Sequence, residues 1–121
     1  MNFISASITG KGGSGTEVSI FESSKITIPK TSANASEGDQ VQLGIRPEHL
    51  LVNQDGDATW ESKVFVVEKL GSGTFLYLEK DGDPLVVEAE GDTNIVVGDT
   101  IKIGFLATRC HLFDSNNQAF Q

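Results

Sequence analysis

The segment Gly10-Lys11-Gly12-Gly13-Ser14-Gly15-Thr16 is the first place where residue types and spacing resemble a phosphate-binding loop. A P-loop has the pattern Gly-x-x-x-x-Gly-Lys-Ser/Thr, with the lysine directly after the last glycine and a helix beginning at once. Here the lysine stands near the front of the segment, and residues 18–21 predict a strand. Because no helix N-terminus is available to hold an anion, we predict a flexible turn.

His49, His111 and Cys110 are the side chains best suited to bind a metal or to act as a nucleophile and its base. They lack the short ligand spacings of zinc sites, and a lone cysteine excludes a four-cysteine site. Neighbouring residues in a strand point to opposite faces, so Cys110 and His111 cannot form a nucleophile–base pair. We predict structural histidines, and we expect no metal and no cofactor in this chain.

Three pairs of carboxylates have a spacing that could suit acid–base chemistry: Asp55/Asp57, Asp81/Asp83 and Glu88/Glu90. All of them flank predicted turns or the solvated faces of predicted strands, where such residues terminate strands and keep a protein soluble. No catalytic constellation remains, and we predict that this chain is not an enzyme.

The densest polar cluster is Arg46-Pro47-Glu48-His49. Pro47 disfavours helix at Arg46, so the preceding strand should run extended into the arginine and then turn. An arginine close to a glutamate suits either an ion pair that locks the turn or an anchor for a partner protein. Two aromatic residues near the end of the chain, Phe113 and Phe120, could cap the core or form an apolar patch for another chain.

Composition limits the classes of partner. The 121 residues carry 17 acidic and 9 basic side chains, a formal net charge of −8, and only one Trp and one Tyr. Such a field repels phosphate backbones and anionic lipid headgroups, so nucleic acid is not expected as a partner. No apolar run is long enough to span a bilayer, and residues 1–10 do not resemble a secretory signal. A single thiol fits a reducing compartment.

Strand patterns dominate the sequence. Val41, Leu43 and Ile45 alternate with polar or small residues, and Ile101, Ile103 and Phe105 do the same. Further strands are predicted at residues 3–8, 18–21, 26–28, 60–70, 75–79 and 85–89, with a tight hairpin at Asp81-Gly82. We expect the polar tail from Asp114 to fray, apart from Phe120. We predict an all-β protein, an OB-fold-like small barrel or sandwich of about eight to ten short strands.

Two motifs recur in the same order. Gly13-Ser14-Gly15-Thr16 returns as Gly71-Ser72-Gly73-Thr74, and the pattern that begins at Gly38-Asp39 returns at Gly98-Asp99. Their nearly constant offset favours a duplicated β unit, with repeats at about residues 1–57 and 58–121, over a coincidence of common turns. We expect the two repeats to share one core within a single domain, residues 1–121.

The octet Leu43-Gly44-Ile45-Arg46-Pro47-Glu48-His49-Leu50 resembles the signature of the C-terminal regulatory domain of sugar-importer ABC ATPases of the maltose-importer type. Residues 1–4 resemble the start of that domain. Residues 66–71 resemble its central strand and glycine turn, and residues 109–114 its closing strand. The resemblance implies an OB-related domain built from a duplicated unit and normally fused behind an ATPase domain, which would bind ATP and magnesium.

The same resemblance implies that the domain holds two copies of the subunit together, contacts permease subunits through the ATPase domain, and in some members receives a regulatory protein. It would lie at the cytoplasmic face of the bacterial inner membrane, without inserting into it. The interface or regulatory candidates are Arg46, Pro47, Glu48, His49, Gly71, Arg109, His111 and Phe113.

Two other functions remain open. Related duplicated domains bind molybdate or similar oxyanions, and the two Gly-Ser-Gly-Thr turns could offer backbone amides for that purpose. The net charge argues against this ligand-sensing function. An OB-type binder of nucleic acid or oligosaccharide would need a basic groove that bears aromatic residues, which this composition does not supply.

Overall fold

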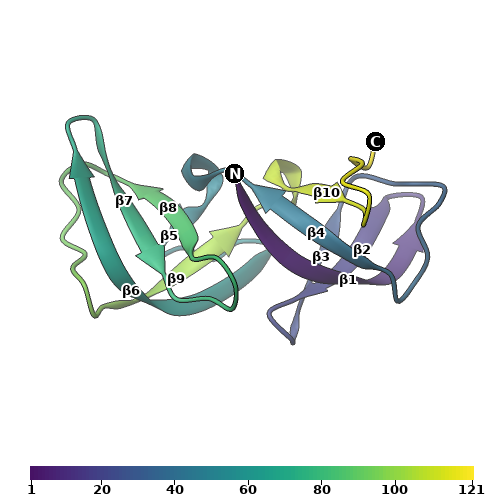
Figure 1. Cartoon of the computed structure of the whole chain (residues 1–121), viewed down its shortest axis with the longest axis horizontal. Helices are drawn as coiled ribbons and strands as arrows, with labels where there is room; N and C mark the ends of the chain where they lie inside the picture. Colours follow the sequence, from purple (N-terminus) through teal and green to yellow (C-terminus); the bar gives the residue numbers. More distant parts are fainter. The chain divides into compact units, whose positions relative to one another are not determined.

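Ten strands and two short 3-10 turns make up the computed structural model, which describes all residues 1–121. The all-β expectation is confirmed, and no helix in the structure is long or apolar enough to cross a membrane. The chain divides into two compact units (Figure 1). Unit 1 comprises residues 1–45 and 106–121, and unit 2 comprises residues 46–105.

Unit 1 is a curled five-stranded antiparallel sheet with the strand order β10-β4-β1-β2-β3. Its strands are β1 (Asn2–Gly12), β2 (Gly15–Ile20), β3 (Ser24–Ile28), β4 (Gln40–Ile45) and β10 (His111–Phe113). Alternate residues of β1, including Ile4, Ala6 and Ile8, are buried, as the period of two in a strand requires. The 3-10 turn η2 (Ala107–Arg109) packs against β3 at the edge of the sheet.

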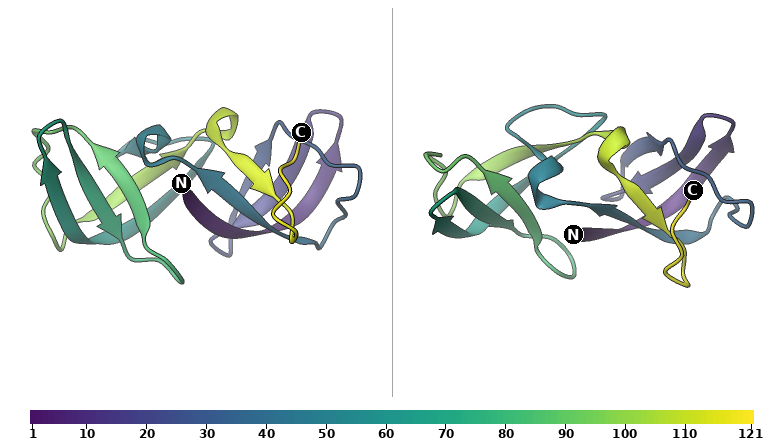
Figure 2. Two further views of the ribbon diagram at one scale, coloured as in Figure 1. Left: turned by 45° about the horizontal axis from the view of Figure 1, so that its top comes forward. Right: turned by 90° about the horizontal axis from the view of Figure 1, so that it is seen from above.

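Unit 2 repeats this plan with the order β5-β9-β6-β7-β8 (Figure 2). Its strands are β5 (Leu51–Val52), β6 (Ala58–Leu70), β7 (Gly73–Leu78), β8 (Leu85–Ala89) and β9 (Thr100–Phe105). The 3-10 turn η1 (Pro47–His49) packs against the edge strand β8. In each unit, the turn therefore covers an edge that an open sheet would expose.

The duplicated β unit is confirmed by the order of the elements. Four strands, a 3-10 turn and a short strand occur once from β1 to β5 and again from β6 to β10. The units do not coincide with the repeats, because each turn and the short strand after it belong to the other repeat's unit. Thus η1 and β5 follow β4 in sequence but complete unit 2, while η2 and β10 complete unit 1.

The two Gly-Asp turns are the same structure twice. Gly38 N–H donates to Ile8 O at 2.8 Å, and Gly98 N–H donates to Val64 O at 2.8 Å. Asp39 accepts the N–H of Ser36 at 2.9 Å, just as Asp99 accepts that of Val96 at 3.0 Å. Both glycines have positive φ, 91° and 99°, which explains why each repeat has glycine there.

Each unit has buried apolar residues of its own, such as Leu43 in unit 1 and Ile103 in unit 2. Two local expectations from the sequence need correction. The β7–β8 connection is not a tight hairpin: it spans residues 79–84, since Glu79 N–H bonds to Lys63 O instead of continuing the ladder to β8.

The tail after Asp114 is held by backbone hydrogen bonds and does not fray, contrary to the sequence expectation. Gln121 exchanges backbone hydrogen bonds with Thr31, at 2.9 and 3.1 Å, and Phe120 N–H donates to Leu112 O. The Phe120 side chain is buried. Phe120 therefore caps the core of unit 1 and does not form an exposed apolar patch for another chain.

Candidate interaction surfaces

The Arg46–His49 cluster of unit 2 has the predicted backbone. Arg46 is extended, with φ −78° and ψ 147°, and Pro47 opens the 3-10 turn η1. His49 N–H donates to Arg46 O at 3.0 Å and closes this turn. Proline suits the first position of such a turn, because a backbone N–H at that position would make no hydrogen bond within the turn.

The ion pair that would have locked this turn is not formed. The salt bridge of the structure joins Lys102 to Asp55 at 3.1 Å, and neither Arg46 nor Glu48 takes part in it. Both side chains are exposed. His49 is half-buried, and its Nδ1 is shielded from solvent without a hydrogen-bond partner. Arg46 and Glu48 therefore leave their charges available at the surface of unit 2.

Gly71 lies in the exposed turn that joins β6 to β7. The equivalent turn in unit 1 contains Gly13, from the segment that superficially resembles a P-loop. A strand follows each turn, as predicted, so neither segment precedes a helix. Both Gly-Ser-Gly-Thr motifs are thus the ends of β-hairpins.

Arg109, His111 and Phe113 belong to unit 1. Arg109 ends η2 and is exposed, whereas His111 and Phe113 are half-buried on β10. Between Arg109 and His111, the buried Cys110 thiol donates to Leu106 O at 3.3 Å. The register pairs both His111 and Phe3 with Gly44, so these three residues share a row on the outer face of the sheet.

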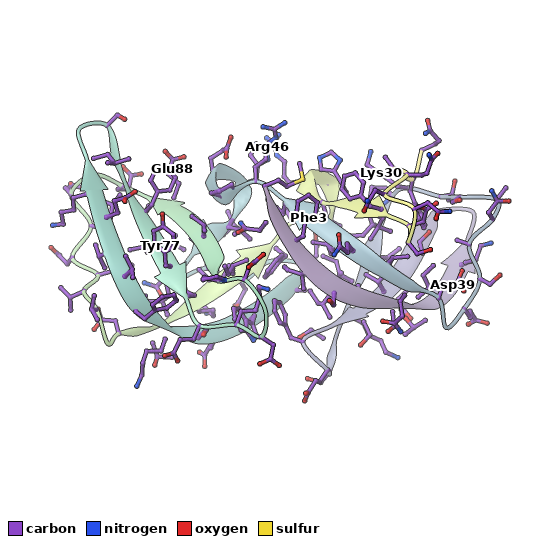
Figure 3. The ribbon with its side chains drawn as sticks, in the orientation of Figure 1. Phe3, Lys30, Asp39, Arg46, Tyr77 and Glu88 are labelled. Carbon is purple, nitrogen blue, oxygen red and sulfur yellow. The ribbon has the colours of Figure 1, made fainter.

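An exposed apolar cluster surrounds Gly44 on the outer face of the unit 1 sheet. The rings of Phe3 and Phe113 meet edge to face, with centroids 5.8 Å apart. A Cβ on Gly44 would lie 2.7 Å from Met1 Sδ and 2.9 Å from a Phe113 ring carbon. Met1 and Phe3 are each 48% exposed (Figure 3 labels Phe3). We call Met1, Phe3 and Phe113 the Gly44 cluster.

Only Phe113 of the Gly44 cluster was a candidate from sequence. The exposure of Phe3 can be inferred from the sequence, because Ile4, Ala6 and Ile8 alternate on the buried face and leave Phe3 on the opposite face of β1. The position of Met1 cannot be inferred in this way, since it depends on the register between β1 and β4.

The units also differ in charge. Unit 1 contains 5 acidic and 4 basic side chains, whereas unit 2 contains 12 acidic and 5 basic ones. Unit 2 therefore carries a formal charge of −7 and unit 1 a charge of −1. The strong field that disfavours anions belongs to unit 2.

Comparison with known proteins agrees with this architecture. The family described as "TOBE domain" matches residues 43–113, and the family described as "MalK OB fold domain" matches residues 1–50. The chain belongs to the TOBE domain family. These matches confirm the resemblance to the regulatory domain of maltose-type importer ATPases that residues 43–50 suggested.

The curated relatives of this TOBE-family chain are longer proteins. It is 40% identical over 121 residues to the maltose/maltodextrin import ATP-binding protein MalK of Vibrio cholerae, covering 98% of this chain and 32% of that protein. It is 32% identical over 123 residues to the alpha-glucoside transport ATP-binding protein AglK of Rhizobium meliloti, covering 100% of this chain and 34% of that protein. The chain thus spans about one third of the length of these relatives.

A solved structure supports the OB-like fold. The cytoplasmic molybdate-binding protein ModG, solved with molybdate bound, has a TM-score of 0.76 to this chain at 12% identity. The match covers 92% of this chain and 94% of the ModG chain. At this identity the likeness shows a shared fold and nothing about a shared ligand.

Proposed function

We propose that this TOBE-family chain is the non-catalytic regulatory and dimerisation domain of the ATP-binding subunit of a bacterial carbohydrate ABC importer. Similarity to the MalK and AglK proteins over nearly the whole chain supports the importer. The observation that carries the dimerisation role is the Gly44 cluster, an exposed apolar surface on the nearly neutral unit. Burying one such aromatic side chain contributes about 1.5–3 kcal/mol.

In this proposal, ATP and magnesium bind in a separate ATPase domain of the same subunit. The partners are a second copy of the subunit, permease subunits reached through the ATPase domain, and a regulatory protein. The complex works at the cytoplasmic face of the inner membrane.

In this mechanism the domain keeps two subunits in contact and takes no part in the chemistry. A lasting contact between two copies keeps the local concentration of the ATPase halves high while nucleotide binds and leaves. A regulator can bias this cycle only by the difference in its affinity for the two arrangements of the dimer.

The charge distribution supports a self-contact through unit 1 rather than unit 2. Two copies that met through unit 2 would each bring a charge of −7, whereas two copies that met through unit 1 would each bring −1. Like charges oppose association most strongly at low salt. We therefore assign the self-contact to the Gly44 cluster, with His111 beside it in the same row. Arg46 and Glu48, which lie on the strongly acidic unit 2, are assigned to a contact with a regulator.

Light scattering at increasing protein concentration tests the dimerisation role. We expect the average mass to rise above 13.0 kDa in the wild type and to stay monomeric in a Phe3→Ser/Phe113→Ser variant. Arg46→Ala, which leaves the Gly44 cluster intact, serves as the second variant. An unchanged average mass would support a contact of Arg46 with a regulator, whereas a lower average mass would place Arg46 at the self-contact. A wild type that remains a monomer at every concentration contradicts the dimerisation role.

A further inference from the structure

The outer face of the β6–β7–β8 sheet in unit 2 is apolar although solvent reaches it. The register places Val66, Tyr77 and Val86 in one row across the three strands. The next row contains Glu68, Phe75 and Glu88. Val66 is 39% exposed, and Phe75, Tyr77 and Val86 are half-buried. We call these six residues the aromatic face (Figure 3 labels Tyr77 and Glu88).

The duplication provides an internal control for this face. In unit 1, the positions equivalent to Phe75 and Tyr77 on the second strand are Glu17 and Ser19. On the third strand, Lys25 is equivalent to Val86. The same sheet therefore forms with polar residues on its outer face, which is the usual arrangement for a solvated antiparallel sheet. The apolar residues of unit 2 are not needed to form the sheet.

The turn before β9 shows the same contrast. Val96 and Val97 are 59% and 60% exposed in unit 2. Ser36 and Glu37 occupy the equivalent places in unit 1, within a turn that makes the same backbone hydrogen bonds. Exposed apolar groups that the fold does not require are a feature of protein interaction sites.

The negative charge around the aromatic face limits the kind of partner that it can bind. Glu68 and Glu88 lie on either side of Phe75, and neither takes part in the salt bridge of the structure. The whole unit carries a charge of −7. A second copy of this surface would therefore be repelled, whereas a positively charged partner would be attracted and oriented.

We propose that the aromatic face docks a basic polypeptide segment in which apolar side chains stand next to lysine or arginine. Phe75 and Tyr77 anchor the apolar side chains, and Glu68 and Glu88 pair with the cations beside them. The inference rests on the proposed function, because it gives the regulatory domain a surface for a different protein, separate from the self-contact on unit 1.

Backbone amide shifts measured by NMR on the 121-residue chain test this proposal with three synthetic peptides. The first alternates leucine and lysine, the second alternates serine and lysine at the same charge, and the third alternates leucine and glutamate. We expect the leucine–lysine peptide to shift the amides of β6, β7 and β8 with a Kd of about 10–100 µM, in the range of weak transient contacts. High salt should weaken this binding at least about tenfold.

The matched variant Tyr77→Ser/Val86→Lys gives the aromatic face two residues of unit 1, so it should fold and lose at least about tenfold in affinity. Ser19→Ala/Lys25→Ala changes the equivalent face of unit 1 and should bind like the wild type. Equal binding of the serine–lysine peptide, equal binding of the leucine–glutamate peptide, or no shift at about 1 mM peptide would each overturn the proposal. Shifts in β6–β8 that depend on protein concentration alone would overturn it in favour of a second copy. None of these outcomes changes the light-scattering result, so the two proposals fail separately.

Discussion

Gly44 and Gly104 occupy the same position in the two units but are covered in different ways. A Cβ on Gly104 would meet the backbone of its own unit, 2.6 Å from Gln54 O and 2.8 Å from Gly56 N. A Cβ on Gly44 would meet side chains instead, Met1 Sδ and the Phe113 ring. In unit 2 the chain itself covers this part of the sheet, whereas in unit 1 an exposed apolar cluster takes that place.

This difference predicts unequal costs for the same substitution. Gly104→Ala should lower the free energy of unfolding by more than about 2 kcal/mol, because backbone atoms must move. Gly44→Ala should cost less than about 1 kcal/mol, because the ends of flexible side chains can move aside. Urea unfolding of both variants measures this, and equal losses would contradict the structural assignment.

Two buried threonines give a second pair of variants. The Thr16 hydroxyl donates to Lys30 O at 2.8 Å, whereas the Thr74 hydroxyl is buried without a partner. Thr74→Val should therefore leave stability unchanged or raise it by about 1 kcal/mol, and Thr16→Val should lower it by about 1 kcal/mol. Thermal and urea unfolding of the two variants would refute this if the signs were reversed.

Because the two Gly-Asp turns have the same structure, alanine substitutions at Gly38 and Gly98 should lower the free energy of unfolding equally. Gly38 and Gly98 both have positive φ, and a Cβ on either would meet no atom within 4 Å. Alanine at either position should cost about 1–2 kcal/mol through backbone strain alone. Chemical unfolding of the two variants should give values that agree within about 0.5 kcal/mol, and a large difference would show that the turns are not equivalent.

The oxyanion-sensing alternative has its own test. Titration calorimetry with molybdate, with sulfate as the control, should show no binding heat. The Gly-Ser-Gly-Thr motifs are hairpin turns, and the chain carries a formal charge of −8. Saturable binding of molybdate would favour a ligand-sensing function over the one proposed here.

The fold could be predicted from sequence because its main signals are local. The alternation of Val41, Leu43 and Ile45 shows a buried strand face directly, and the positive φ of Gly38 requires the glycine that marks the repeat. The exchange of η1–β5 and η2–β10 between the units could not be predicted. A strand of two residues, Leu51–Val52, has no periodicity, and its partner β9 lies far away in the sequence.

The candidate surfaces were predicted less completely. The Arg46 turn was visible because Pro47 restricts the residue before it. The Gly44 cluster depends on the pairing of β1, β4 and β10, and only Phe113 stood out without that register. The contrast between Tyr77 and Ser19 likewise appears only when the two sheets are compared strand by strand.

Site-specific cross-linking tests the central claim, that two copies meet through unit 1, most directly. Ser5 is exposed and shares a row of the outer face with Phe113, while the native Cys110 is buried. A short bismaleimide should therefore join two copies of Ser5→Cys efficiently, and several-fold less efficiently when Phe113→Ser is added. The control Ser72→Cys, at the exposed hairpin turn of unit 2, should give no cross-linked dimer. Equal cross-linking of Ser5→Cys and Ser72→Cys, or none of either, would contradict the account.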